Sequence, residues 1–166
     1  VCPNGLESQT GPGAAAPNAG NHGSHVAGIA AGDNPGYSEG EAYRGIAPDA
    51  DILAVQVFSK FTGVAFCADY NYPSPCYLTY RDDQIAGLEF VYSQRNSHTI
   101  AAANMSLGGG GYTSYCDTDL RKAIIDLLRL ADIATVISSG NSGYCDGVGA
   151  PGCISSAVTV GATTKD

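Results

Sequence analysis

The segment 22–28 (HGSHVAG) places two histidines, His22 and His25, about one helical turn apart. Imidazole titrates close to neutral pH, so a histidine can serve as the base that activates a weak hydroxyl nucleophile. A hydrogen-bonded packing role is the ordinary alternative. A His-x-x-His metal pair is another, but the segment lacks the Glu and the third ligand of the zinc peptidases. Acid–base chemistry, packing and metal binding are therefore the roles open to these residues.

Two further segments combine small and polar residues. Residues 138–142 (SSGNS) include Asn141, and residues 104–110 (NMSLGGG) end in a run of glycines. An isolated Gly-Asn-Ser ordinarily marks a turn in which asparagine adopts left-handed backbone. The glycine run has tight turns as its ordinary role, because it lacks both the GxGxxG spacing and the Lys-Ser/Thr ending of nucleotide-binding loops.

Apolar runs and helical spacing predict the elements that position these segments. Helices are expected over 22–32, 82–96 and 117–131, and strands over 51–58, 100–107, 135–139 and 157–162. We expect Asn21 to cap the first helix and Asp82 or Asp83 the second, with an irregular loop over 59–75. Strands that alternate with helices predict an α/β fold: a doubly wound, mostly parallel sheet with helices on both faces, buried on both sides. Ligands in such folds bind beyond the carboxyl ends of the strands.

The segments 21–28, 104–110 and 138–142 occur in the order in which the subtilase family of serine peptidases carries similar motifs. Residues 45–51 (GIAPDAD) also resemble that family's turn into its next strand. The resemblance extends from about Asn21 to Ala162. It implies a subtilisin-like fold and a serine endopeptidase that hydrolyses peptide bonds in proteins through an Asp/His/Ser triad.

The resemblance also implies roles for individual residues. His22 would be the catalytic base and Asn141 the oxyanion-hole donor, while His25 is better explained by packing. Main-chain groups of residues 106–108 would pair with an extended substrate. Residues 138–140 would form a wall of the pocket that binds the substrate residue before the cut. Gly149 would be the floor of that pocket and leave room for a large apolar or aromatic side chain. The pairing residues are Ser106, Leu107 and Gly108, and the wall residues are Ser138, Ser139 and Gly140.

Two motifs of the family do not occur in this sequence. The family's Asp-Ser/Thr-Gly motif does not precede His22, and its Gly-Thr-Ser-Met-Ala motif does not follow residue 142. We therefore expect residues 1–166 to be an internal fragment of a single peptidase catalytic domain, without the Asp-motif and Ser-motif regions and inactive alone. One alternative is a catalytically inactive subtilase-like binding domain. Another is an unrelated doubly wound α/β protein that binds a small ligand.

The amino-acid composition limits the kinds of partner that the protein is expected to bind. The net charge is −8 and the eight basic residues are scattered, so no nucleic-acid partner is expected. No apolar run is long enough to span a membrane. We expect a monomer that acts on protein or peptide substrates and needs no cofactor for its chemistry. The resemblance allows a structural calcium ion, for which the loop at Asp33 and Asn34 could supply oxygens, but a plain surface turn explains that loop as well; the metal ligands are unknown.

The cysteine count points to the compartment. Six cysteines without C-x-x-C spacing favour disulfides and a secreted protein, although buried free thiols in a cytosolic protein are the alternative. Six cysteines allow 15 connectivities. From the chain organisation we expect two disulfides and leave Cys145 unassigned, while Cys2 could pair with a cysteine outside this sequence. The expected pairs are Cys67–Cys76, which closes a short loop, and Cys116–Cys153, whose members flank carboxyl ends of strands.

Overall fold

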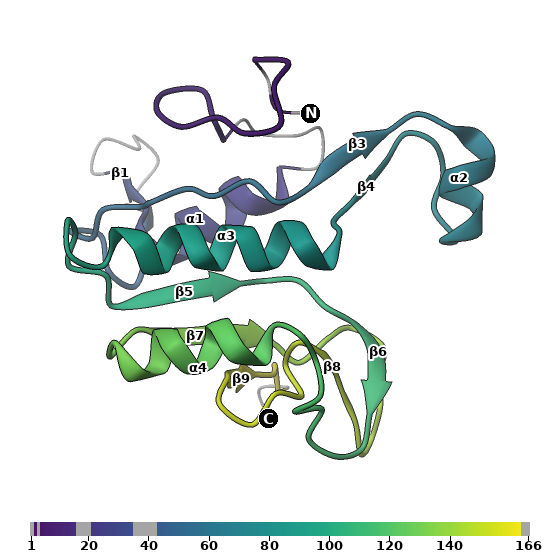
Figure 1. Cartoon of the computed structure of the whole chain (residues 1–166). Helices are drawn as coiled ribbons and strands as arrows, with labels where there is room; N and C mark the ends of the chain where they lie inside the picture. The colour runs from purple at the N-terminus through teal and green to yellow at the C-terminus, as the bar shows by residue number, and fades with distance from the viewer. Residues whose placement is uncertain (1, 3, 16–20, 35–42, 164–166) are drawn as a thin grey trace. The chain divides into compact units, whose positions relative to one another are not determined.

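A computed structural model describes residues 2, 4–15, 21–34 and 43–163 (Figure 1). The chain divides into two compact units, Val1–Gln56 and Val57–Asp166, which are described one at a time. The helices are α1 (His22–Ala31), α2 (Val64–Asp69), α3 (Arg81–Gln94) and α4 (Lys122–Leu130). The strands are β1 (Asp33–Asn34), β2 (Tyr43–Arg44), β3 (Ser59–Phe61), β4 (Cys76–Leu78), β5 (Ala102–Met105), β6 (Gly109–Tyr112), β7 (Ala134–Ser138), β8 (Val148–Ala150) and β9 (Val158–Val160).

In the first unit, α1 confirms the predicted helix over 22–32 to within one residue. The predicted cap is wrong in detail, because Asn21 has left-handed backbone with φ of 49° and makes no side-chain capping bond. A capping side chain normally needs extended backbone to reach the free N–H groups of the first turn. None of the α1 residues is buried.

The end of α1 is held by the segment that follows β2. The N–H groups of Ile46 and Ala47 donate to the carbonyls of Ile29 and Ala30 at 3.0 and 2.8 Å. A Cβ on Gly45 would lie 2.7 Å from the backbone nitrogens of Ala31 and Gly32, so only glycine fits at this contact. Within the segment 45–51, the glycine at position 45 is therefore explained by this close contact.

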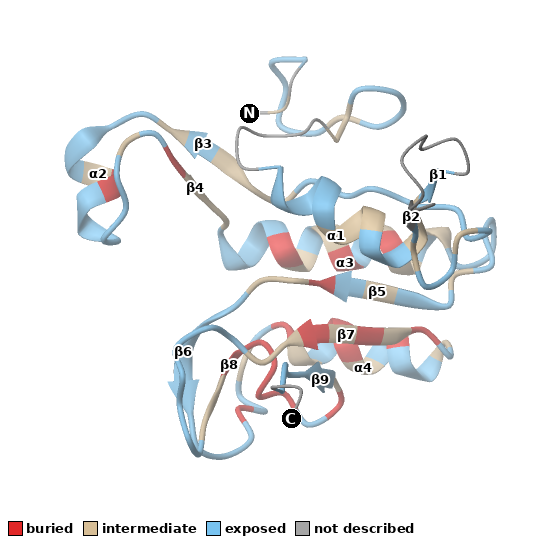
Figure 2. Ribbon diagram, turned by 180° about the vertical axis from the view of Figure 1, so that it is seen from behind, coloured by how far each residue is buried: buried red, intermediate tan, exposed pale blue. Residues whose placement is uncertain are grey.

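The second unit is built on a parallel sheet in the order β5-β7-β9. This sheet confirms the α/β fold class, and the predicted strands over 100–107, 135–139 and 157–162 correspond to its members. Helix α4 packs on β7 and against α3, and the buried residues of these elements form one core (Figures 1 and 2). The centre of that core is fully buried: Ile125 and Leu128 of α4, Ile137 of β7 and Ile154 are at most 1% exposed.

Among the described residues, burial differs between the middle strand of the sheet and one edge strand. Thr135 and Ile137 of β7 are buried, but Val158 and Val160 of β9 are 50% and 52% exposed. Among the described strands, β9 pairs only with β7 and so lies at one edge of the sheet. The expectation of burial on both faces is therefore wrong for this edge.

Two loop and strand assignments also differ from expectation. Residues 51–58 form no strand, and Ile52, Leu53 and Val55 are exposed. An apolar run becomes a strand only as part of a sheet, and the described sheets do not include residues 51–58. Residues 59–75 are more ordered than an irregular loop, because β3 pairs with β4 and α2 lies between them.

The two helices that were predicted in the second unit start at other residues than expected. Helix α3 begins at Arg81, so Asp82 and Asp83 lie in its first turn, where carboxylates stabilise a helix, instead of at the cap. Helix α4 begins at Lys122 and not at Asp117. Asp117 instead accepts hydrogen bonds from the Ser155 N–H and hydroxyl at 2.9 and 2.7 Å, bonds that hold its pKa below the ordinary value.

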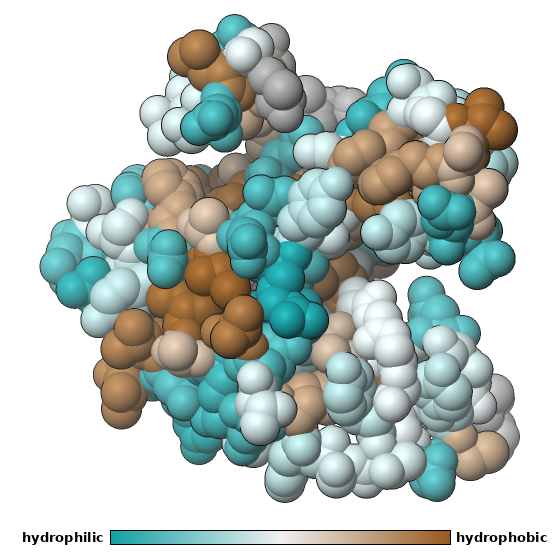
Figure 3. Space-filling model, turned by 45° about the vertical axis from the view of Figure 1, so that its right-hand side comes forward, coloured by the Kyte–Doolittle hydropathy of each residue, from teal (hydrophilic) through white to brown (hydrophobic). Residues whose placement is uncertain are grey.

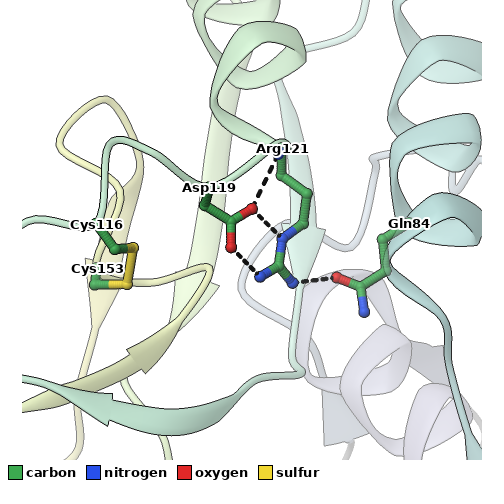
Figure 4. A network of polar contacts seen from close by, with 5 residues as sticks. All are labelled: Gln84, Cys116, Asp119, Arg121 and Cys153. Atoms are coloured by element: carbon green, nitrogen blue, oxygen red, sulfur yellow. Dashed lines mark hydrogen bonds and ion pairs between the residues drawn. A yellow bond between two sulfur atoms is a disulfide. The ribbon is translucent and has the colours of Figure 1, made fainter.

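Both expected disulfides are confirmed. Cys67–Cys76 ties α2 to β4, and Cys116–Cys153 ties the segment before α4 to the segment after β8, with Cα–Cα distances of 5.7 and 5.3 Å. Beside the second disulfide, the guanidinium of Arg121 binds both carboxylate oxygens of Asp119 and donates to Gln84 of α3 at 2.7 Å (Figure 4). This buried network joins the start of α4 to α3.

Candidate active site

A pocket of about 270 Å³ lies at the carboxyl ends of the parallel strands in the second unit. Its lining comes from the residues that follow β5, β7 and β9 and from β8. The prediction that ligand contacts gather at this edge is consistent with this position. Among the predicted site residues the pocket collects Gly108, Ser139, Gly140, Asn141 and Gly149.

Backbone hydrogen bonds fix these segments to one another. The parallel pairing of β5 with β7 aligns Met105 with Ile137, so both chains leave the sheet together. The N–H of Ser139 donates to Val160 at 2.8 Å, and the Ser139 carbonyl accepts the N–H of Gly149 at 2.8 Å. A backbone hydrogen bond therefore joins Ser139, of the predicted pocket wall, to Gly149, the predicted pocket floor.

Glycine is favoured at two points of this edge by backbone geometry or close packing. Gly140 has φ of 111°, a conformation that other residues rarely adopt. A Cβ on Gly149 would lie 3.3 Å from the backbone nitrogen of Gly109, because β6 and β8 pair closely there. Close backbone approach is thus a second reason for glycine at 149, besides room for a ligand.

Three predicted substrate-binding residues do not line the pocket. Ser138 and Leu107 instead bond to each other, since the Ser138 hydroxyl donates to the Leu107 carbonyl at 3.3 Å. The hydroxyl of Ser106 accepts a hydrogen bond from the Asn104 amide at 3.0 Å. These contacts hold the start of the pocket rim in place, and the pairing of its main chain with a substrate stays a prediction.

The two predicted catalytic residues belong to different units. His22 is exposed at the start of α1 in the first unit, and Asn141 is exposed in the second. The structure therefore places each in its own surroundings: His22 on an open helix end, Asn141 on the pocket wall. The joint action of the two side chains stays a prediction.

None of the described residues that line the pocket carries a charged side chain. Its remaining lining was not predicted, and Figure 3 shows the surface over β6 and β8 as nearly neutral in hydropathy. Most of these residues belong to β6 or to the loop between β7 and β8, and the antiparallel pairing of β6 with β8 brings these two parts together, a long-range contact that the sequence pattern does not reveal. The missed residues are Gly109, Gly110, Ser142, Gly143, Tyr144, Gly147 and Ala162.

The loop considered for calcium has a different partner. Asp33 pairs with Arg44 across β1 and β2, with 3.2 Å between Oδ1 and Nε. A carboxylate that already binds a guanidinium is a poor start for a calcium site, and residues 35–42 of the loop lie outside the described residues. Within the described ranges, no three His, Cys, Asp or Glu residues gather as metal ligands would. None of the described helices has the length and apolar character needed to cross a bilayer.

Comparison with known proteins decides the family. A family model described as "Subtilase family" matches residues 4–166. The chain belongs to the subtilase family. A protein named Subtilisin from Bacillus sp. (strain TA39) is 30% identical over 143 residues, which cover 85% of this chain and 29% of the relative. Serine protease AprX of Bacillus subtilis (strain 168) is 29% identical over 153 residues, with the same coverage. The subtilase chain described here thus spans 29% of the length of these curated relatives.

Proposed function

We propose that the protein carrying this chain is a secreted, subtilisin-like serine endopeptidase that hydrolyses peptide bonds in proteins. Membership of the subtilase family and the names of its relatives support this function. The single observation that carries it is the uncharged pocket that brings Asn141 together with Ser139, Gly140 and Gly149. The two disulfides support secretion, because such bonds persist in oxidising compartments.

In the proposed mechanism, His22 takes the proton of a serine hydroxyl as the serine oxygen attacks the scissile carbonyl carbon. The carbonyl oxygen becomes negatively charged, and the Asn141 amide donates a hydrogen bond to it. His22 then gives the proton to the leaving amine, and water releases the acylated serine by the same steps in reverse. The serine and the aspartate of the triad belong to motifs that this chain does not contain. This chemistry uses no cofactor, and calcium enters the proposal only as a structural ion.

The substrate would lie extended across the pocket rim. Main-chain groups of Ser106, Leu107 and Gly108 would pair with the substrate backbone, and the substrate side chain before the cut would enter the pocket. Since the described lining of the pocket includes no charged side chain, an uncharged side chain fits it best. The proposed partners are therefore proteins or peptides, bound by a monomer without nucleic acid or membrane.

Substitution of His22 in the full-length protein tests the proposal. His22→Ala should lower peptidase turnover by several orders of magnitude with folding unchanged, because the serine loses its base. His25→Ala is the matched control, since it removes an exposed imidazole of the same helix and should retain turnover. Retained turnover in His22→Ala would exclude the role of His22.

Labelling by a serine-directed phosphonate provides an independent test. The full-length protein should be labelled at one serine, and prior labelling should abolish turnover. Absence of both labelling and turnover, with retained peptide binding, would identify the protein as an inactive subtilase-like binding domain.

A further inference from the structure

Tyr144 is the one aromatic side chain among the residues that line the described pocket. It lies on the loop that leaves β7 and returns to β8, three residues after Asn141. Its side chain remains 54% exposed, so the ring is available to a ligand. Tyr144 therefore gives the described lining of the pocket an aromatic side chain that is open to contact.

The position of the ring depends on a glycine of β6. A Cβ on Gly111 would lie 2.7 and 2.8 Å from Cε2 and Cζ of Tyr144, well inside van der Waals contact. The ring thus lies directly against the bare backbone of β6. Any larger residue at 111 would push the ring aside, at little cost in stability because the end of a flexible side chain can move.

The other residues of the described lining offer no comparable apolar surface. Gly108, Ser139, Gly140 and Gly149 present backbone and one hydroxyl, and the described lining includes no charged side chain. An aromatic or large apolar group that enters would bury its surface mainly against the Tyr144 ring. Pairs of aromatic rings gain stabilisation beyond the burial of their area when they meet edge to face or offset.

We propose that Tyr144 determines specificity: its ring, seated on Gly111, forms the wall of the pocket that selects an aromatic side chain of a polypeptide substrate. This inference rests on the proposed peptidase function. A purely structural role for Tyr144, as packing that holds the loop on β6, is the competing explanation. The two differ because packing affects all substrates equally, whereas a specificity wall changes the ratio between substrates.

The test measures kcat/KM of the full-length protein for two peptides that differ only in Phe or Leu before the cut. Tyr144→Ala should lower the Phe-to-Leu ratio roughly threefold to tenfold, the range that an aromatic pair contributes. Tyr144→Phe keeps the ring and should leave the ratio unchanged. Gly111→Ala should lower the ratio in the same direction, because it displaces the ring without removing it. Tyr115→Ala is the control, since Tyr115 is 77% exposed and does not line the pocket.

The outcomes separate this inference from the proposed function. Full turnover with an unchanged ratio in Tyr144→Ala would overturn the specificity role and leave the peptidase function standing. Absence of turnover and of phosphonate labelling in the unmodified protein would overturn both. If Tyr144→Ala does not fold, Gly111→Ala decides alone: a lowered ratio supports the role of the ring, and an unchanged ratio overturns it.

Discussion

Helices α1 and α4 were both expected from the sequence, yet they are stabilised in different ways. Helix α4 buries Ile124, Ile125 and Leu128 in the core of the second unit. Helix α1 buries none of its residues, and its described tertiary bonds are backbone bonds to the segment at Gly45. The first helix is held by its backbone and the second by its side chains. The same kind of sequence signal therefore does not tell how a helix is anchored.

The largest effect on the free energy of unfolding is expected from the buried ion pair between Arg121 and Asp119 at the start of α4. Arg121→Leu should lower the free energy of unfolding by about 3–5 kcal/mol, because Asp119 would stay buried without its partner. Both side chains of this ion pair are 7% exposed. Urea denaturation of the full-length protein measures the change. Lys122→Leu is the control, since its pair with Asp126 is more exposed and should contribute only about 0.5 kcal/mol.

The same ion pair gives a pH dependence. Hydrogen bonds from the Arg121 side chain hold the pKa of Asp119 below its ordinary value. A carboxyl whose pKa is lower in the folded state stabilises the protein above its unfolded pKa of about 3.9, and this stabilisation is lost as the pH falls through the folded pKa. Unfolding free energies measured from neutral to acidic pH should therefore fall less steeply in Arg121→Leu. An equal slope in both proteins would contradict this contribution of Asp119.

Next in size is the direct comparison of the two helices. Ile125→Ala removes a side chain that is 0% exposed and should cost about 2–5 kcal/mol of unfolding free energy. Ile29→Ala makes the same change on α1, where the side chain is 49% exposed, and should cost under about 1 kcal/mol. Equal losses would show that α1 is anchored by side chains after all.

This comparison also shows how far the sequence predicts the fold. Helical spacing and apolar runs are short-range signals, so α1, α3, α4 and the three strands of the parallel sheet could be predicted. Residues 51–58 carry the same apolar signal, but a strand also needs a neighbour, which local pattern does not reveal. The predicted start of α4 at Asp117 was wrong because residues before Lys122 are held outside the helix by side-chain hydrogen bonds. Asp117 accepts a bond from the distant Ser155, and Asp119 accepts one from the nearby Arg121 N–H.

The same distinction between local pattern and long-range contact explains which residues of the candidate site could be predicted. Parallel topology brings the carboxyl ends of β5 and β7 together, so Gly108, Ser139 and Asn141 could be predicted to gather. Tyr144 could not, because its place follows from the antiparallel pairing of β6 with β8 and from the absence of a side chain at Gly111. Such long-range contacts leave no periodic trace in a single sequence.

A smaller effect should come from the backbone contact that anchors α1. Gly45→Ala would place a Cβ 2.7 Å from two backbone nitrogens at the end of α1, atoms that cannot move without opening the helix end. Overpacking of this kind costs about 1–3 kcal/mol. Amide hydrogen exchange should show lost protection in residues 29–34, with the second unit unchanged. Unchanged protection would mean that the segment after β2 does not hold the helix.

The smallest effect separates the two modes of anchoring most sharply. Gly23 lies in the first turn of α1, and a Cβ there would meet no atom within 4 Å. Gly23→Ala should therefore raise the protection of α1 by about 0.5 kcal/mol, because alanine loses less backbone entropy than glycine in a helix. Helix α4 should not respond. A decrease in protection would show that the added methyl group meets a neighbour in the full-length protein, in which case α1, like α4, is anchored by packing of its surface as well as by its backbone.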